Sequence, residues 1–345
     1  MSDKLLNLIF KITEKYNDPA NGKPFNSNNP HLNVALKHGH VNISIDIDQS
    51  QKDLYEAISA KIKNEISLIN EILSVNIILT SEKSKNNGDE RKNRFQINAK
   101  NIIAIASGKG GVGKSTFAVN YAVALEKIGF KVGILDADIY GPSIPRMMGI
   151  TGKPKTNNNK LVPLLSYGIK CMSIGFLIDE NTPAIWRGPM IMKALEQMFN
   201  GVEWGDLDYL IIDLPPGTGD AQLSLAQNSK ISGSIIISTP QDVALIDARK
   251  GINMFKKVNV PVIGIVENMS YFICTNCKER HEIFSNGGAK KEAEKFNTPF
   301  LGELPIDINL RLYSDQGKPI CISDPENAIA KTYISIAKNI NDNIN

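Results

Sequence analysis

The sequence predicts an α/β protein in which a doubly wound domain with a mainly parallel sheet follows a small α+β domain. Three observations support this. Residues 99–345 contain short runs of Ile and Val separated by helical patterns. Residues 1–80 contain strands with strict alternation of apolar and polar residues, and helices with one apolar stripe. Residues 81–98 are densely charged and nearly free of apolar side chains, which indicates a solvated linker between the two domains.

The small domain is expected to consist of a helix, two strands, a second helix and a third strand. Helical spacing of apolar residues predicts the helices, and alternation predicts the strands. The first helix contains Leu5–Ile12 and the second Leu54–Ile69, while the strands lie near His31–Leu36, at Val41–Ile47 and at Val75–Leu79.

The strands of the large domain are predicted from apolar runs without strict alternation, which is typical of parallel strands covered by helices on both faces. Helical patterns such as Phe117–Ile128 and Met190–Phe199 separate them, and alternating strands and helices favour a doubly wound fold. Ligands of such folds bind at the carboxyl ends of the strands. The predicted strands are Ile102–Ala106, Val132–Leu135, Tyr209–Ile212, Ser234–Ser238 and Val262–Val266.

Composition excludes several classes of protein. The 345 residues carry a formal net charge of +3, which is too small to indicate a nucleic-acid partner by itself. We find no apolar run of about 18 residues, so no transmembrane helix is expected. The first residues lack the features of a signal peptide, and four cysteines in a chain of this length make a poor disulfide framework. We therefore expect a cytoplasmic protein.

A phosphate-binding loop follows the first strand of the large domain. The segment Gly108–Ser115 matches the Walker A pattern and opens a helix, which is the context that the motif requires. Lys114 is expected to reach the β- and γ-phosphates of ATP, and the Ser115 hydroxyl to ligate Mg²⁺. The predicted nucleotide-binding residues are Gly108, Lys109, Gly110, Gly111, Val112, Gly113, Lys114, Ser115 and Thr116.

Lys109 is an additional lysine inside this loop. It could be a surface charge, or it could be a second cation for the phosphates, including those of a partner subunit. The pattern Lys-Gly-Gly-x-Gly-Lys-Ser/Thr defines the deviant Walker A group and favours the second interpretation.

Aspartates end two of the predicted strands. Asp136 and Asp138 follow Val132–Leu135, and Asp213 follows Tyr209–Ile212 in the Walker B position. An aspartate at a strand end often caps a helix, but three of them beside a Walker A loop favour a magnesium site. We expect Asp136 and Asp213 to serve Mg²⁺ and Asp138 to orient the attacking water.

Cys274 and Cys277 form a CxxC pair after the strand Val262–Val266. One such pair supplies two thiolates, whereas a closed zinc site or a 4Fe–4S cluster needs four ligands. His281 is near enough to be a third ligand for zinc, and a redox dithiol is a further alternative. The simplest source of four thiolates is two copies of the chain related by a twofold axis. Cys171 and Cys321 are expected to be structural.

These motifs together resemble the Mrp/ApbC iron–sulfur cluster carrier ATPases. The resemblance extends from Ile102 to Ile320, and the segments that carry it are Ser107–Thr116, Leu135–Ser143, Ile185–Met190, Asp213–Asp220 and Glu267–Tyr271 with the CxxC pair.

The resemblance implies a homodimer that binds ATP and Mg²⁺, hydrolyses ATP, and carries a 4Fe–4S cluster on Cys274 and Cys277 of both subunits. It implies that ATP binds through Lys114 and Ser115 and that Lys109 acts across the dimer. With Asp138, the expected catalytic residues are therefore Lys109, Lys114 and Asp138. It also implies that Asn268 contacts the adenine, and that Pro305 and Asp307 belong to the loop that closes over the base. The partners would be a cluster-assembly scaffold and apo-proteins, with neither nucleic acid nor membrane.

Residues 1–80 are similar to the small iron–sulfur-assembly domain that often precedes this ATPase. Such domains often carry a cysteine near the second helix, and this chain has none before Cys171. A docking role is therefore expected for them.

Two other functions remain open from the residues alone. A positioning or partitioning ATPase would share the deviant Walker A loop, but it would leave the CxxC pair without a role. A zinc-bridged structural dimer with regulatory ATP binding would use the same thiolates, because thiolates bind both zinc and iron.

Overall fold

The computed structural model describes residues 2–37, 39–47, 51–80, 95, 97–177 and 188–344. The chain separates into two compact units, Met1–Glu90 and Arg91–Asn345. Most of the predicted linker (residues 81–94 and 96) lies outside the described residues, as do Ile185–Arg187 of the family resemblance.

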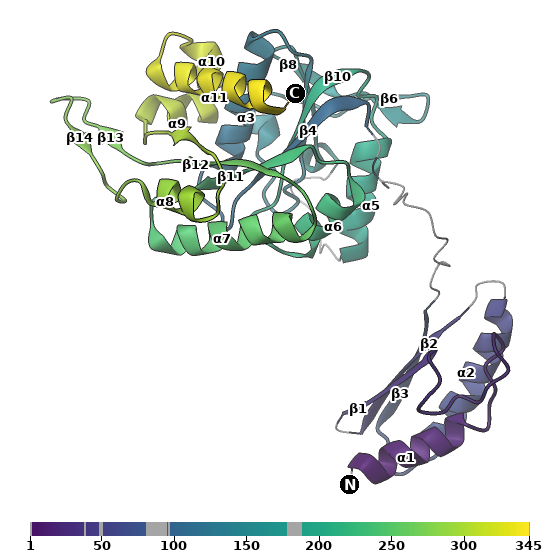
Figure 1. Ribbon diagram of the computed structural model, residues 1–345. Helices are drawn as coiled ribbons and strands as arrows, with labels where there is room; N and C mark the ends of the chain where they lie inside the picture. The colour runs from purple at the N-terminus through teal and green to yellow at the C-terminus, as the bar shows by residue number, and fades with distance from the viewer. Residues whose placement is uncertain are drawn as a thin grey trace. The chain divides into compact units, whose positions relative to one another are not determined.

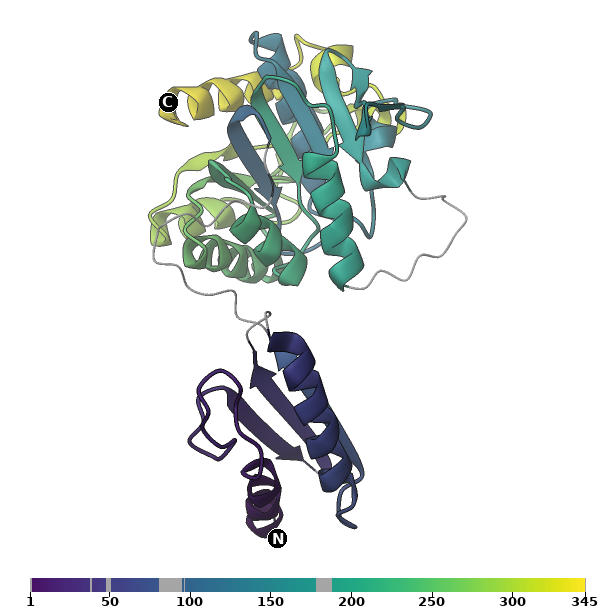
Figure 2. The same cartoon turned by 90° about the vertical axis from the view of Figure 1, so that its right-hand side faces the viewer.

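The first unit has the predicted order of elements. Three strands form a sheet of order β1-β2-β3, in which β1 and β2 are antiparallel and β2 and β3 are parallel (Figure 2). Val41, Ile43 and Ile45 alternate into the core and pack with Ile62 and Ile66 of the second helix. The elements are α1 (Ser2–Thr13), β1 (Leu32–Lys37), β2 (His40–Asp46), α2 (Lys52–Ser67) and β3 (Ser74–Thr80).

The second unit contains an eight-stranded sheet of order β15-β12-β11-β4-β10-β5-β9-β8 (Figure 1). Every neighbouring pair is parallel except β8 with β9 at the edge. The predicted doubly wound, mainly parallel fold is confirmed. The strands are β4 (Ala99–Ala106), β5 (Val132–Asp136), β8 (Leu164–Ser166), β9 (Ile169–Ser173), β10 (Leu207–Asp213), β11 (Gly233–Ser238), β12 (Val262–Glu267) and β15 (Phe300–Glu303).

Helices cover both faces of this sheet, which explains why its strands do not alternate in polarity. On β4, Ile103 and Ile105 pack with α3, α10 and α11, while Ile102 and Ala104 pack with α5, α6, α7 and α8. No helix among the described residues is long and apolar enough to span a bilayer. The helices are α3 (Lys114–Lys127), α4 (Ile144–Met147), α5 (Gly188–Asn200), α6 (Asp220–Asn228), α7 (Asp242–Lys257), α8 (Gly288–Lys295), α9 (Ile308–Asp315), α10 (Ile320–Ser323) and α11 (Ala328–Ile344).

Two small hairpins lie outside the main sheet. One joins β6 (Thr156–Asn157) to β7 (Lys160–Leu161), and the other joins β13 (Phe272–Ile273) to β14 (Arg280–His281). The second hairpin follows β12 and carries the CxxC pair in its turn (Figure 1).

The second unit begins earlier than the sequence predicts. Phe95, which we placed in the solvated linker, is 2% exposed, and its ring stacks on Phe199 with centroids 4.8 Å apart. Its backbone N–H donates to Asn228 O at 3.0 Å, so this residue is anchored to α6 as well as to α5. A single apolar residue in a charged segment gives no periodic signal, and the predicted boundary at residue 98 is therefore too late.

We expect the second unit to fold without the first. A truncated chain that starts at Arg91 keeps Phe95 and should stay soluble, bind nucleotide and hydrolyse ATP like the full chain. Phe95→Ala in the full chain should lower the free energy of unfolding by about 3–5 kcal/mol, because it removes a buried ring. ATPase and nucleotide-binding assays test the truncated chain, and denaturant unfolding gives the free energy of unfolding of Phe95→Ala. A truncated chain that is insoluble or does not bind nucleotide would show that the two units depend on each other.

Candidate nucleotide and thiol sites

The P-loop connects β4 to α3 at the carboxyl edge of the sheet. Gly111 and Gly113 have φ values of 81° and 83°, which non-glycine residues rarely adopt. A Cβ on Gly113 would also lie 2.2 Å from Asn268 Nδ2. Glycine is therefore required where the loop turns into the helix. The helix N-terminus and the loop amides make this a suitable place for phosphate.

Lys114, Ser115 and Asp213 form a buried polar cluster at this edge. Lys114 Nζ lies 2.6 Å from Asp213 Oδ1, and the Ser115 hydroxyl donates to Asp213 Oδ2 at 2.5 Å. Asp213 is fully buried, and burial raises its pKa although the Lys114 ammonium acts in the opposite direction. The structure thus brings together the three residues that the sequence assigned to the phosphates and Mg²⁺.

Asp138 lies at the edge of the same cluster. Its Oδ2 is 3.6 Å from Lys114 Nζ, and the residue is 8% exposed. Among the described residues, its buried Oδ1 has no hydrogen-bond partner. An unsatisfied carboxylate oxygen beside the P-loop is suited to accept a hydrogen bond from a water molecule or to face a cation.

Strand register positions Asp136, and its carboxylate accepts hydrogen bonds from the protein itself, which the sequence does not predict. It is paired with Asp213 across β5 and β10. Its Oδ2 accepts from the backbone N–H groups of Ser143 and Ile144 and from the Ser173 hydroxyl, at 3.0–3.1 Å. Burial, followed by the charge of Asp213, raises the pKa of Asp136 to about 7. These contacts make it an anchor for the loop after β5.

Lys109 extends from the loop toward α7. Its Nζ lies 3.4 Å from Gln241 Oε1, and the side chain is only partly buried. No carboxylate among the described residues forms an ion pair with Lys109, so the ammonium is available to a phosphate group.

A pocket of about 560 Å³ opens beside the loop. It contains all three residues that the resemblance assigned to the base, since Asn268, Pro305 and Asp307 line it together with Gly113 and Thr116. Asn268 Nδ2 donates to Val112 O at 2.8 Å, while its buried Oδ1 has no hydrogen-bond partner among the described residues. Asp307 accepts from Leu310 N at 2.8 Å and so begins α9.

Several pocket residues were missed by sequence reasoning. They come from α4, from the turn after β12, from the segment after β14 and from α9, and no motif connects these segments. They are Arg146, Met147, Met269, Phe284, Leu310 and Arg311. Met269 has a positive φ of 55° in the turn after β12, which is unusual for a non-glycine residue, but such strain has no signature in a single sequence.

The CxxC pair lies at the tip of the β13–β14 hairpin. Cys277 is exposed and Cys274 is partly exposed, whereas Cys171 and Cys321 are buried in the core, as expected of structural thiols. The pKa of Cys274 is lowered, first by hydrogen bonds from the backbone N–H groups of Cys277 and Asn276. The hairpin therefore presents two accessible sulfur atoms at its turn, and one of them has an environment that favours thiolate.

A prediction follows from the geometry of Asp138. Asp138→Asn keeps the size of the side chain but removes the charge, so nucleotide binding should persist while the hydrolysis rate falls about 10²-fold. Steady-state ATPase assays and equilibrium binding of a fluorescent ATP analogue measure the two effects. Asp315→Asn, an exposed aspartate at the pocket rim, is the matched control. Wild-type turnover in Asp138→Asn would exclude a role in positioning water.

A family model and several known proteins match the second unit of this chain. The family of NUBPL iron-transfer P-loop NTPases, within the ParA group, matches residues 98–341. A protein of Arabidopsis thaliana, named an iron–sulfur protein required for NADH dehydrogenase, is 54% identical over 243 residues, 70% of this chain and 78% of its own. The iron–sulfur cluster carrier protein of Escherichia coli K12 is 54% identical over 252 residues, 72% of this chain and 68% of its own.

Solved structures show the same fold. A nucleotide-binding protein from Archaeoglobus fulgidus, in complex with ADP and with Co found in it, has a TM-score of 0.59 and 44% identity, over 67% of this chain and 90% of its own. The cell-division ATPase MinD of Pyrococcus furiosus has a TM-score of 0.53 at 21% identity, over 70% and 99% of the two chains, and shows the likeness of fold alone.

Proposed function

Because this chain belongs to the NUBPL iron-transfer P-loop NTPases, we propose that it is an ATP-hydrolysing carrier that holds a 4Fe–4S cluster between two subunits. The cluster would be received from an assembly scaffold and delivered to apo-proteins. The observation that carries the proposal is the presence, in one compact unit, of the Lys114–Asp213 phosphate site and of an exposed CxxC hairpin.

ATP would bind with its phosphates on the P-loop and its base in the adjoining pocket. Lys114 would move from Asp213 to the phosphates, and Asn268 Oδ1 is free to accept from an exocyclic amino group. Pro305 and Asp307 would form the wall over the base.

The oxygen atoms at the strand ends fit magnesium. The Ser115 hydroxyl and the Asp213 carboxylate would hold it, with Asp136 in support through retained water, and the unsatisfied Asp138 Oδ1 is the oxygen left for the attacking water. When bound, Mg²⁺ neutralises phosphate charge. Lys109 would add a second cation, and we assign it to the partner's nucleotide because this lysine belongs to the deviant Walker A pattern and its Nζ lies near Gln241, apart from the cluster of Lys114 and Asp213.

The cluster is cargo, and the hairpin would hold it. One hairpin provides two thiolates, so a 4Fe–4S cluster would be shared by two chains about a twofold axis.

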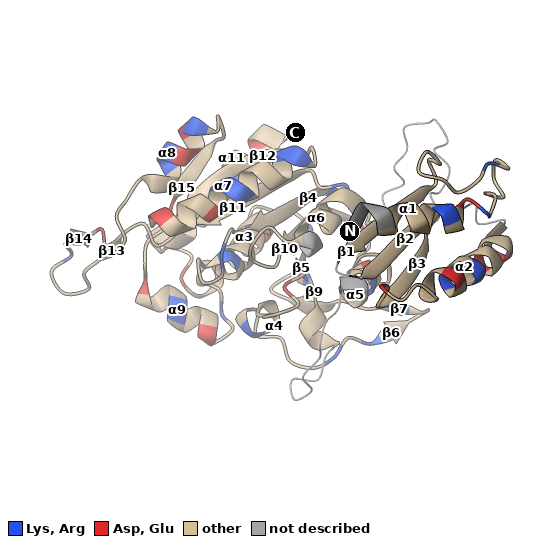
Figure 3. Ribbon diagram, turned by 90° about the horizontal axis from the view of Figure 1, so that it is seen from below, with Lys and Arg blue, Asp and Glu red and all other residues tan. Residues whose placement is uncertain are grey.

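Accessible free thiols suit a reducing compartment such as the cytoplasm. Acidic and basic residues are mixed on α7, α8 and α9 (Figure 3), which supports protein partners in preference to nucleic acid or a membrane surface. The first unit would be a docking site for these partner proteins.

A continuous contact supports coupling between the two sites. Ile306, which lines the nucleotide pocket, donates its backbone N–H to Tyr271 O at 2.7 Å and pairs with Phe272 of the hairpin. Phe284, three residues beyond β14, lines the same pocket. A base that moves these residues would also act on the hairpin, and we propose that ATP binding or hydrolysis thereby changes the release of the cluster.

The test is cluster transfer. The full chain, reconstituted without oxygen, should contain four iron atoms per two chains and should activate an apo 4Fe–4S acceptor enzyme faster with Mg-ATP than with Mg-ADP. A zinc-containing protein without iron, or transfer at the same rate with either nucleotide, would count against the proposal. The first result would favour the zinc-bridged dimer, and the second would separate ATP turnover from delivery.

A further inference from the structure

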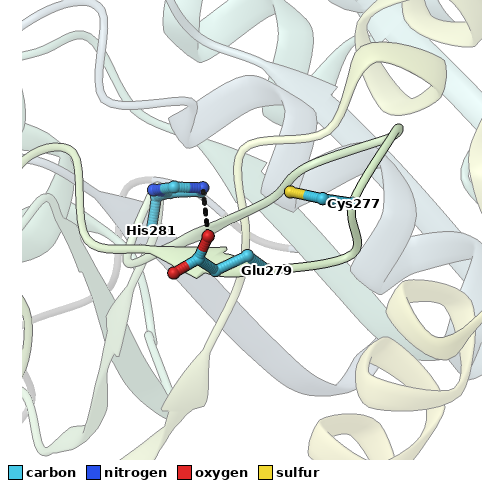
Figure 4. A group of neighbouring side chains, drawn as sticks. All are labelled: Cys277, Glu279 and His281. Carbon is cyan, nitrogen blue, oxygen red and sulfur yellow. Dashed lines mark ion pairs between the residues drawn. The ribbon is translucent and has the colours of Figure 1, made fainter.

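Three potential metal ligands converge on one side of the β13–β14 hairpin. Cys277 Sγ, a carboxylate oxygen of Glu279 and a ring nitrogen of His281 all lie within 4.8 Å of one another. Figure 4 shows the three side chains directed toward one another, with His281 Nε2 3.9 Å from Glu279 Oε2. Within the described part of the chain, no other group of Cys, His and acidic side chains meets this spacing.

The hairpin backbone produces this convergence. Cys274 N donates to Glu279 O at 2.9 Å, and Lys278 N donates to Cys274 O at 3.0 Å, which closes the turn around the two cysteines. Lys278 has a positive φ of 64° at this turn. Because side chains on a strand alternate, Glu279 and His281 share one face of the strand.

The residue between them is directed elsewhere and holds the hairpin in place. Arg280 lies 3.9 Å from the centre of the Tyr271 ring, and its Nη1 is 3.1 Å from Glu303 Oε1 on β15. The face that bears Glu279 and His281 is thereby left exposed to solvent. The arrangement is a fixed backbone with adjustable ligand side chains.

We propose that a single hairpin binds one thiophilic divalent cation, such as Zn²⁺, through Cys277, Glu279 and His281, with Cys274 as the fourth ligand. A tetrahedral zinc site has metal–ligand bonds of about 2.0–2.3 Å, so its ligand atoms are about 3.5 Å apart. Cys277, Glu279 and His281 are exposed and already within 4.8 Å of one another, and the Cys274 side chain is hydrogen-bonded to that of Cys277, so side-chain rotations would bring the four ligand atoms to that spacing. The two sulfurs, one nitrogen and one oxygen complete the coordination without a second chain.

This site shares its thiols with the proposed cluster but does not depend on that function, because a chain that never carries a cluster would still bind the ion. When Cys274 and Cys277 hold such a cation, they are unavailable to bridge two chains. The mononuclear ion and the shared cluster therefore exclude each other, and zinc would act as a competitor at the cluster site.

Cobalt provides the test, since Co²⁺ in a tetrahedral site with thiolate ligands has intense visible absorption. Titration of the reduced full chain with Co²⁺ under anaerobic conditions should saturate at one ion per chain, and Zn²⁺ should displace it. His281→Ala and Glu279→Gln should each weaken Co²⁺ binding by about tenfold or more, because even changes behind the ligands cost that much. Glu282 is a neighbouring exposed carboxylate outside the group of three ligands, so Glu282→Gln should leave the Co²⁺ affinity unchanged.

The same variants separate this inference from the cluster proposal. His281→Ala should still assemble a 4Fe–4S cluster, while Cys277→Ser should lose both the cluster and the Co²⁺ absorption. Saturation at one Co²⁺ per two chains, or an affinity that His281→Ala and Glu279→Gln do not change, would overturn the single-chain site. The first result would show that the thiols of two hairpins hold the ion, and the second that His281 and Glu279 are not its ligands.

Discussion

Lys114→Ala should reduce ATP hydrolysis by about 10³-fold or more, because it removes the buried cation of the phosphate site. Lys114 Nζ is 2.6 Å from Asp213 Oδ1 and 3.6 Å from Asp138 Oδ2. No other Lys or Arg among the described residues is paired with either carboxylate. The same change leaves Asp213 buried without its cation, so part of the loss should appear as weaker binding of magnesium nucleotide.

Steady-state phosphate release and calorimetric nucleotide binding measure these two losses. Lys127→Ala is the matched control, since Lys127 lies in the last turn of the same helix and is exposed. It should retain wild-type turnover. A folded Lys114→Ala protein that hydrolyses ATP at the wild-type rate would place the phosphates elsewhere.

Cys274→Ser should abolish cluster binding while ATP binding is unchanged. A 4Fe–4S cluster needs four thiolates, and two hairpins provide four only when both cysteines of each chain are present. The hairpin thiols are accessible, whereas Cys171 and Cys321 are buried. Burial raises the pKa of Cys321 to about 12, which keeps that thiol protonated and chemically inert at neutral pH.

Iron and sulfide analysis after anaerobic reconstitution, with visible absorption, measures this effect. The wild-type chain should hold one cluster per two chains, and Cys321→Ala should do the same. If Cys274→Ser still binds a cluster, the cluster ligands would have to be the buried thiols of Cys171 and Cys321. One cluster per single chain would remove the twofold arrangement.

The central sheet was predictable because each of its inner strands carries its own signal. Runs such as Ile102–Ala106 and Val132–Leu135 are apolar on both faces, and they form β4 and β5. The P-loop was predictable for a similar reason, since a contiguous motif contains all the glycines that its turns require. Edge elements were not predicted, because β8 and β15 are short and only partly buried.

The residues of the pocket that we propose for the base could be predicted only through resemblance. Its walls come from α3, α4, the turn after β12 and α9, and proximity of these segments arises from the folded chain. Arg146 and Phe284 have no pattern in the sequence that would mark them as neighbours of Asn268. The environment of Asp136 was likewise hidden, because the Ser143, Ile144 and Ser173 donors converge on it from two separate segments.

The hydrogen bond from Ile306 to Tyr271 has a thermodynamic consequence for the two bound molecules. If nucleotide in the pocket changes the affinity of the hairpin for its cargo by some factor, the cargo must change the affinity for nucleotide by the same factor. A loaded carrier and an empty one would then hold different fractions of ATP at the same cellular concentration. The nucleotide occupancy of the chain would in that way report whether its sulfur atoms are occupied.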